Sequence, residues 1–263
     1  MEVEDASLDG FLSGKPLPAE AAIVRDYRDQ FALARRVNRE CHRLIFGADV
    51  RNRDGQAMSI AGLFLRSLQH YQAVVLVLEK GLVASGKVSV RAELEAVFAL
   101  RMVAASEENF RAFVHDDLIR RRRLMENAKK YDYPILATLR EVISDEDIEE
   151  IKQRIISVGA TELSTRKMSE EAGLHDLYVG VYPLLSRAAH SNVGELDAYL
   201  IQGADSEVRE IDYAPSRDEI PSLLLTAADF ILLGADAVAG RFEVDFGTMR
   251  TELSAAIKAG LDE

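Results

Sequence analysis

Residues 60–78 read IAGLFLRSLQHYQAVVLVL, and their large apolar side chains recur three and four positions apart. Side chains at that spacing lie on one face of an α-helix, whereas a strand returns to the same face at every second residue. The stretch therefore predicts one long helix with a buried stripe. The stripe consists of Ile60, Leu63, Phe64, Tyr71, Val74, Val75 and Leu78.

Helical patterns also dominate outside this stretch. Proline fits the first turn of a helix, and a serine can cap that turn by accepting a hydrogen bond from a free backbone N–H. We expect such helix starts at Pro18, Ser89, Ser144 and Ser216. Only residues 207–213, EVREIDY, have a strand-like pattern. The sequence predicts an all-α protein, an irregular multi-helix bundle with at most one short strand or hairpin near 207–213.

One domain accounts for this pattern. The chain has 263 residues, 48% of them hydrophobic, which is enough to bury a substantial core. Its sequence has no internal repeat, low-complexity tract or clear linker. We therefore expect a mobile N-terminus over residues 1–15 and a single helical domain over residues 16–263.

Charge is distributed unevenly along the chain. The net charge is −12, yet residues 1–140 hold 22 Lys and Arg against 19 Asp and Glu, while residues 141–263 hold 10 against 25. An acidic C-terminal half repels phosphate backbones, so RNA would have to contact a run of four arginines in the first half. The competing interpretation is a solvated helix face that nearby carboxylates neutralise. The arginines are Arg120, Arg121, Arg122 and Arg123, and the carboxylates are Asp116, Asp117 and Glu126.

Cys41 is the only cysteine, so an intrachain disulfide is excluded. A single thiol suits a reducing compartment, and we expect the protein in the cytoplasm. The N-terminus MEVEDASLDG lacks the basic-then-apolar order of a signal peptide. The most apolar run, residues 220–240, contains Asp229 and Asp236, which favours a core helix over a membrane span. A long apolar helix of this kind also leaves room for a homodimer.

No metal or cofactor is expected. The sequence lacks HExxH, paired Glu-x-x-His and cysteine clusters, so zinc and di-iron sites would have no ligands. Neither Gly-Lys pair belongs to a GxxxxGK[ST] loop, which would cradle phosphate.

Four polar residues fall on otherwise apolar helix faces. Arg91 and Glu95 share a face of one predicted helix, and Ser186 and His190 share a face of a later one. A buried polar group without a partner costs roughly 1 to 3 kcal/mol, and a charge costs more. We therefore expect the two segments to meet inside the protein, where these side chains bond to one another.

Three motifs together resemble a known family. They are RAELE at residues 91–95, KMSEEAGLHDLY at residues 167–178, and Y-x-x-L-S-x-x-x-H at residues 182–190. Their order and spacing are similar to the bacterial domain-of-unknown-function family five-six-seven-seven, over about residues 60–200. The resemblance implies a helical fold and a shared polar site, and it implies no established activity.

Two functions fit these residues, and whether the chain is an enzyme stays open. We expect a binding, regulatory or defence-associated module whose polar network pins two helices together. The alternative is a metal-independent ribonuclease similar to the helical nucleotide-binding toxins, in which histidine carries a proton and arginine stabilises phosphate charge. A serine hydrolase is disfavoured because the GxSxG elbow is absent. The candidate catalytic residues are Arg91, Glu95, Ser186 and His190, with Arg36 and His42 as a weaker pair at the toxin spacing.

Overall fold

The computed structural model describes residues 10–12, 17–50, 54–190, 193–203, 207–211 and 214–261. In this part of the chain the protein is helical apart from one small hairpin, which confirms the predicted fold class. The N-terminal segment that we predicted to be mobile, residues 1–15, lies outside the described residues except for a short 3-10 turn at Gly10–Leu12.

A helical hairpin forms the base of the core. α4 (Gly55–Glu79) and α5 (Val83–Ala105) pack against each other along their length. Gly81 turns the chain between them at φ +73°, and a Cβ there would lie 2.6 Å from the Cβ of Pro215, so glycine is required. The stripe predicted over residues 60–78 lies on the inner face of α4, where all its members are buried except the half-buried Leu63.

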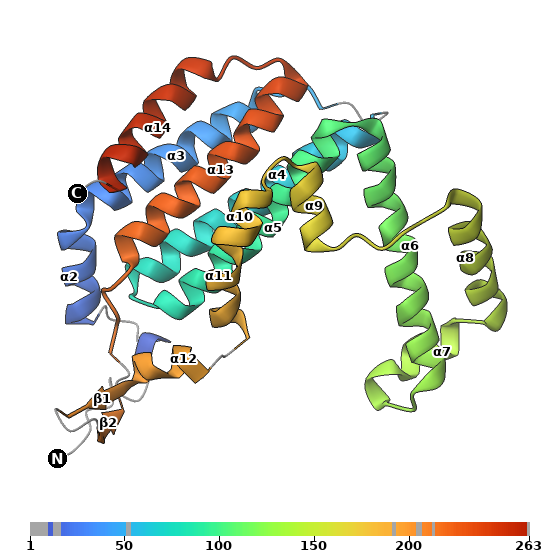
Figure 1. The fold of residues 1–263 in the computed structure, drawn as a ribbon, viewed down its shortest axis with the longest axis horizontal. Coiled ribbons are helices and arrows are strands. Elements are labelled where there is room, and N and C mark those ends of the chain that lie inside the picture. Colours follow the sequence, from blue (N-terminus) through green and yellow to red (C-terminus); the bar gives the residue numbers. More distant parts are fainter. Residues whose placement is uncertain are drawn as a thin grey trace.

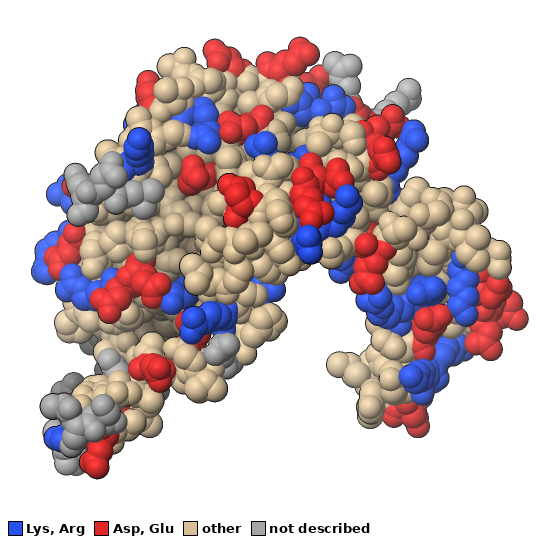
Figure 2. Space-filling view, in the orientation of Figure 1, with Lys and Arg blue, Asp and Glu red and all other residues tan. Residues whose placement is uncertain are grey.

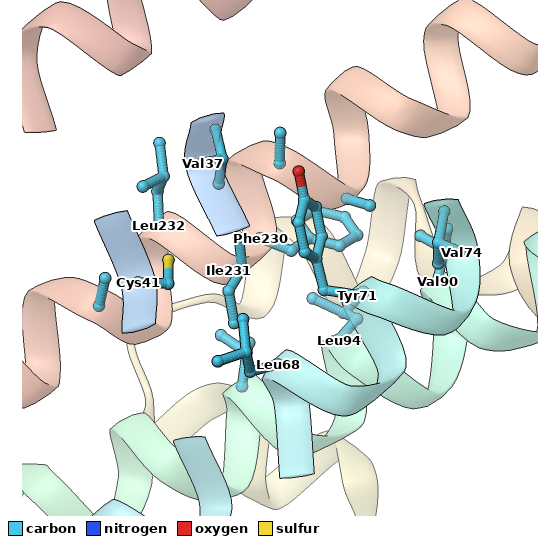
Figure 3. Packing of buried hydrophobic residues seen from close by; sticks show 14 of the residues in the cluster. Val37, Cys41, Leu68, Tyr71, Val74, Val90, Leu94, Phe230, Ile231 and Leu232 are labelled. Atoms are coloured by element: carbon cyan, nitrogen blue, oxygen red, sulfur yellow. The ribbon is translucent and has the colours of Figure 1, made fainter. Parts of the chain in front are cut away.

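α13 (Ile220–Phe242) packs against this hairpin and against α3 (Arg28–Phe46). Figure 3 shows Phe230 and Ile231 of α13 close to Cys41 of α3 and Tyr71 of α4. Within the described residues, α13 is the one helix long and apolar enough to cross a membrane. Most of its apolar window, 61%, is buried inside the protein, as expected for a core helix.

The remaining elements surround this core (Figure 1). α2 and α14 contact α3, and α9 and α11 contact α5. α6, α7 and α8 form an arm that projects away from the body (Figure 1). The bounds are α2 (Pro18–Asp26), α6 (Glu107–Lys130), α7 (Ala137–Val142), α8 (Asp145–Val158), α9 (Thr165–Glu171), α10 (His175–Gly180), α11 (Tyr182–Ala189), α12 (Val193–Leu196) and α14 (Gly247–Leu261), with 3-10 turns at Pro134–Leu136 and Asp197–Tyr199.

Helix starts follow the predicted chemistry at two of the four expected positions. Pro18 is the first residue of α2, and Ser144 forms a full capping box at the start of α8. Ser89 is not a cap, because α5 begins further upstream and the serine hydroxyl donates to a carbonyl one turn back. The start predicted at Ser216 is also wrong, because Glu219 takes a left-handed conformation (φ 64°) and α13 begins after it.

The predicted hairpin is present. β1 (Leu200–Gln202) pairs antiparallel with β2 (Val208–Ile211), with an irregularity in register between Ile201 and Gln202. β2 falls within the strand predicted over residues 207–213, of which residues 212–213 lie outside the described residues.

Candidate functional site

Arg91 and Glu95 occupy successive turns of α5. The Arg91 Nε donates a hydrogen bond to Glu95 Oε1 over 3.1 Å. Their side chains are only partly shielded from water, with exposed fractions of 19% and 37%. The predicted pair therefore forms, but it lies at the edge of the core rather than within it.

Tyr182 links this pair to α11. Its hydroxyl donates to Glu95 Oε1 over 2.7 Å and accepts a hydrogen bond from Arg91 Nη2 over 2.9 Å. The Arg91 guanidinium also lies 5.0 Å from the centre of the Tyr182 ring. Our sequence analysis did not assign Tyr182 to the site. The available indication was its place in the Y-x-x-L-S-x-x-x-H motif.

The protonation states of these groups follow from the contacts. Burial, and then the hydrogen bond to Glu95, raise the pKa of Tyr182 above its ordinary value. Burial lowers the pKa of Arg91, but the hydrogen bond that Arg91 donates to Tyr182 and the charge of Glu95 outweigh it and leave that pKa raised. At neutral pH the tyrosine is therefore a donor and the arginine a cation, so the bonding pattern is fixed.

Aromatic rings extend the contact between α5 and the helices that cover it. His175 stacks on Tyr178 at 5.7 Å between ring centres, and Tyr178 stacks on Tyr182 at 5.2 Å. Arg91 lies at the other end, over the Tyr182 ring. This column of four side chains joins α10 and α11 to α5. Because Tyr178 and Arg91 cover the Tyr182 ring, it is not free to stack on a ligand.

His190 lies at the rim of this arrangement. Its Nε2 is 3.4 Å from Arg91 Nη1, so the histidine accepts this long contact only through an unprotonated Nε2. We predicted that Ser186 and His190 face the interior, and this is wrong for His190, which is exposed. α11 ends at Ala189, and His190 follows it as the C-cap residue with φ −101° and ψ 14°, so His190 does not continue the helix face of Tyr182 and Leu185.

Ser186 is half-buried and does not join the bonded residues. Within the described part of the chain its hydroxyl makes no hydrogen bond, to His190 or to any other group. We use the name α5–α11 cluster for the four residues that do interact. They are Arg91, Glu95, Tyr182 and His190.

A groove of about 540 Å³ opens beside the α5–α11 cluster. Its wall is largely apolar, and two cationic or titratable groups, Arg187 and His190, stand on its rim. The rim is not strongly basic, because Glu195 lies 4.0 Å from Arg187 and 3.5 Å from Lys87. Figure 2 shows the same mixture of acidic and basic side chains over this face of the molecule. The groove is lined by Tyr178, Val179, Tyr182, Pro183, Ser186, Arg187 and His190.

Arg36 and His42 do not form the site predicted from their spacing. Arg36 Nη2 donates to Glu252 over 2.7 Å, whereas His42 Nδ1 donates to the backbone oxygen of Asn38 over 2.8 Å. Six residues place two side chains on different sides of one helix, so each finds its own partners. Across the described ranges, no group of at least three His, Cys, Asp or Glu could hold a metal ion.

Each arginine of the run in α6 has an acidic partner. The ion pairs are Arg120–Asp116 at 2.5 Å, Arg121–Asp117 at 2.5 Å, Arg122–Glu126 at 3.8 Å and Arg123–Glu162 at 2.9 Å. In the first three pairs the partners are four residues apart on α6, which is the helical spacing that we expected for a neutralised surface. RNA binding here would have to displace these carboxylates.

Glu93 is a buried acid that our sequence reasoning did not select. Its side chain is 0% exposed, and neither carboxyl oxygen has a hydrogen-bond partner within the described residues. Burial raises the pKa of this carboxyl well above its ordinary value. Burial likewise raises the pKa of the Cys41 thiol. Both groups are therefore neutral members of the core.

A comparison with protein families matches residues 58–207 to the Family of unknown function (DUF5677). These residues contain the whole α5–α11 cluster. A search of curated proteins and a search of solved structures found no match to this chain. Since the family match spans more than half of the 263 residues, the chain belongs to the DUF5677 family.

Proposed function

We propose that the protein is a cytoplasmic binding or regulatory module whose ligand occupies the groove beside the α5–α11 cluster. The observation that carries this proposal is the closed bonding of Glu95. One oxygen of Glu95 accepts hydrogen bonds from both Arg91 and Tyr182. Such an arrangement fixes the position of α11 against α5 and so gives the groove a defined shape.

The same bonding disfavours acid–base chemistry at the cluster. A general base must be able to take up a proton, yet Glu95 is held by an arginine and a tyrosine hydroxyl. Tyr182 does not release its proton near neutral pH, because its pKa is raised. His190 is the one member of the cluster on the open rim. Because His190 is the single group here that could transfer a proton and its neighbours are held by hydrogen bonds, the cluster fits ligand binding better than catalysis.

The groove wall indicates what kind of ligand it suits. Tyr178, Val179 and Pro183 present apolar surface, and Arg187 and His190 can bind an acidic group at the rim. We infer a ligand with an apolar portion and a carboxylate or phosphate. A regulatory role, including one in bacterial defence, would follow if such a ligand changes how the protein engages a partner.

Ligand-dependent melting tests this function. A panel of acidic, partly apolar peptides and metabolites would be added to the wild type and to Arg187→Glu. A ligand at about 100 times its Kd adds roughly 2.7 kcal/mol to the stability of the state that binds it. We expect a subset to raise the Tm of the wild type but not of Arg187→Glu. Equal shifts in both proteins, or none in either, would contradict groove binding.

A ribonuclease is the second candidate, because Arg91 and the exposed His190 lie 3.4 Å apart on an open surface. In such an enzyme the histidine would move a proton and the arginine would stabilise the phosphorane. Total RNA would be incubated with the wild type, His190→Ala and His42→Ala. Cleavage that only His190→Ala abolishes would establish the enzyme. Intact RNA in all three samples supports the binding module.

A further inference from the structure

A second cavity, of about 270 Å³, lies on the other side of Glu95. It forms where α4, α5, α6 and α9 converge, away from the groove beside α11. Its volume is near the lower end of the range of roughly 300 to 1,000 Å³ that is typical of ligand pockets. The cavity can therefore hold a small molecule.

Arg66 and His70 face this cavity from successive turns of α4. Within the described residues, neither side chain takes part in a hydrogen bond or an ion pair. Burial, and then the charge of Arg66, lower the pKa of His70 against the opposing effect of Glu95. At neutral pH the pair is thus one cation beside one neutral imidazole, and both have hydrogen-bond donors to offer.

The acidic side chains that line the cavity are already occupied. Glu95 is held by the cluster, and Asp116 accepts hydrogen bonds from Arg120 over 2.5 Å and from the backbone N–H of Leu163 over 2.9 Å. Arg66 is consequently the lining cation that no carboxylate in the described structure neutralises. Arg66 is exposed, and an arginine that lines a cavity without an ion-pair partner can bind an anionic ligand.

The rest of the lining is apolar. Ala92 and Ala96 lie one turn apart on α5 and present only methyl groups to the cavity. Phe113 of α6 and Met168 of α9 also line it. The small alanine side chains leave room for a ring, and Phe and Met make favourable contacts with aromatic rings.

We propose that this cavity binds a small aromatic anion, whose charged group pairs with Arg66 and accepts a hydrogen bond from His70 while its ring lies on Ala92 and Ala96. This site is independent of the proposed groove. Aromatic carboxylates and nucleoside monophosphates share the required chemistry, a flat ring with an anionic group.

Calorimetric titration of the full chain tests the proposal. The probes are benzoate and salicylate as carboxylates, AMP and UMP as phosphates, and inorganic phosphate as an anion without a ring. We expect at least one aromatic anion to bind and inorganic phosphate to bind far more weakly. The class that binds more tightly, the carboxylates or the nucleotides, identifies which anionic group the cavity recognises. Failure of every aromatic anion to bind at millimolar concentration would overturn the proposal.

Variants then locate the bound anion. Arg66→Gln removes the charge from an exposed position, so it should fold normally and weaken binding roughly 10- to 100-fold. Arg111→Gln removes an exposed arginine outside the cavity and should bind like the wild type. Ala92→Leu fills the floor and should abolish binding. Wild-type affinity in Arg66→Gln overturns the proposal even if Ala92→Leu does not fold.

Arg187→Glu separates this site from the groove. If the aromatic anion binds in the cavity, its affinity is unchanged in Arg187→Glu and reduced in Arg66→Gln. The reverse pattern assigns the ligand to the groove and overturns the cavity site while it supports the proposed function.

Discussion

Replacement of Glu93 by methionine is expected to stabilise the protein at pH 7. The carboxyl is fully buried and both its oxygens lack hydrogen-bond partners in the described structure. A buried polar group in this situation costs roughly 1 to 3 kcal/mol, whereas methionine has a similar length and adapts to its surroundings. We expect a gain of at least about 2 kcal/mol, which for a chain of this size raises the Tm by roughly 4 °C or more.

The gain should also depend on pH. Burial raises the pKa of Glu93 in the folded protein, while the unfolded chain ionises near the ordinary glutamate value of about 4.3. Above that value the unfolded state binds fewer protons than the folded state, so the free energy of unfolding falls as the pH rises. This loss continues, at about 1.4 kcal/mol per pH unit, until the folded carboxyl itself ionises.

Urea denaturation at several pH values between 5 and 8 measures both effects in the wild type, Glu93→Met and Glu93→Gln. The glutamine variant is the matched control, because it keeps the polar atoms but does not ionise. The free energy of unfolding of Glu93→Gln should not fall as the pH rises, but this variant should gain less stability than Glu93→Met. The reasoning is refuted if Glu93→Met is less stable than the wild type at pH 7, or if their difference does not change with pH.

Three further predictions concern stability and reactivity. Arg91→Ala should lower the Tm by roughly 2 to 8 °C in differential scanning fluorimetry, because it leaves Tyr182 and Glu95 without a shared partner. In the same assay His190→Ala, at an exposed position, should change the Tm by no more than about 2 °C. Cys41, with a raised pKa and 0% exposure, should resist iodoacetamide in the native protein and react after unfolding, as mass spectrometry would show. Gly81→Ala should lower the free energy of unfolding by roughly 2 kcal/mol or more, measured by urea denaturation, because of its positive φ and the contact a Cβ would make.

Much of the fold could be predicted from the sequence, because helix packing imposes a periodic pattern on the residues. The spacing of apolar side chains in residues 60–78 located α4 and its inner face. The four-residue spacing of Arg91 and Glu95 correctly placed them on one side of α5. Glu93 could also have been found, since Val90 and Val97 flank it at spacings of three and four on a buried face.

The rest depends on features that one helix pattern does not contain. The exposure of His190 follows from the end of α11 at Ala189, which leaves His190 outside the helix. The central role of Tyr182 depends on where α11 crosses α5. Arg66 and His70 form a site only because α6 and α9 close a cavity around them without supplying a free carboxylate. Such placements are set by tertiary packing.

The contact between Tyr182 and Glu95 carries the claim that α11 is fixed on α5 by the α5–α11 cluster. A double-mutant cycle with Tyr182→Phe and Glu95→Gln, measured by urea denaturation, tests it directly. Side chains joined by a hydrogen bond of 2.7 Å should show a coupling of about 1 kcal/mol, with the double variant less destabilised than the two single effects together. Additive effects, within roughly 0.3 kcal/mol, would contradict the claim.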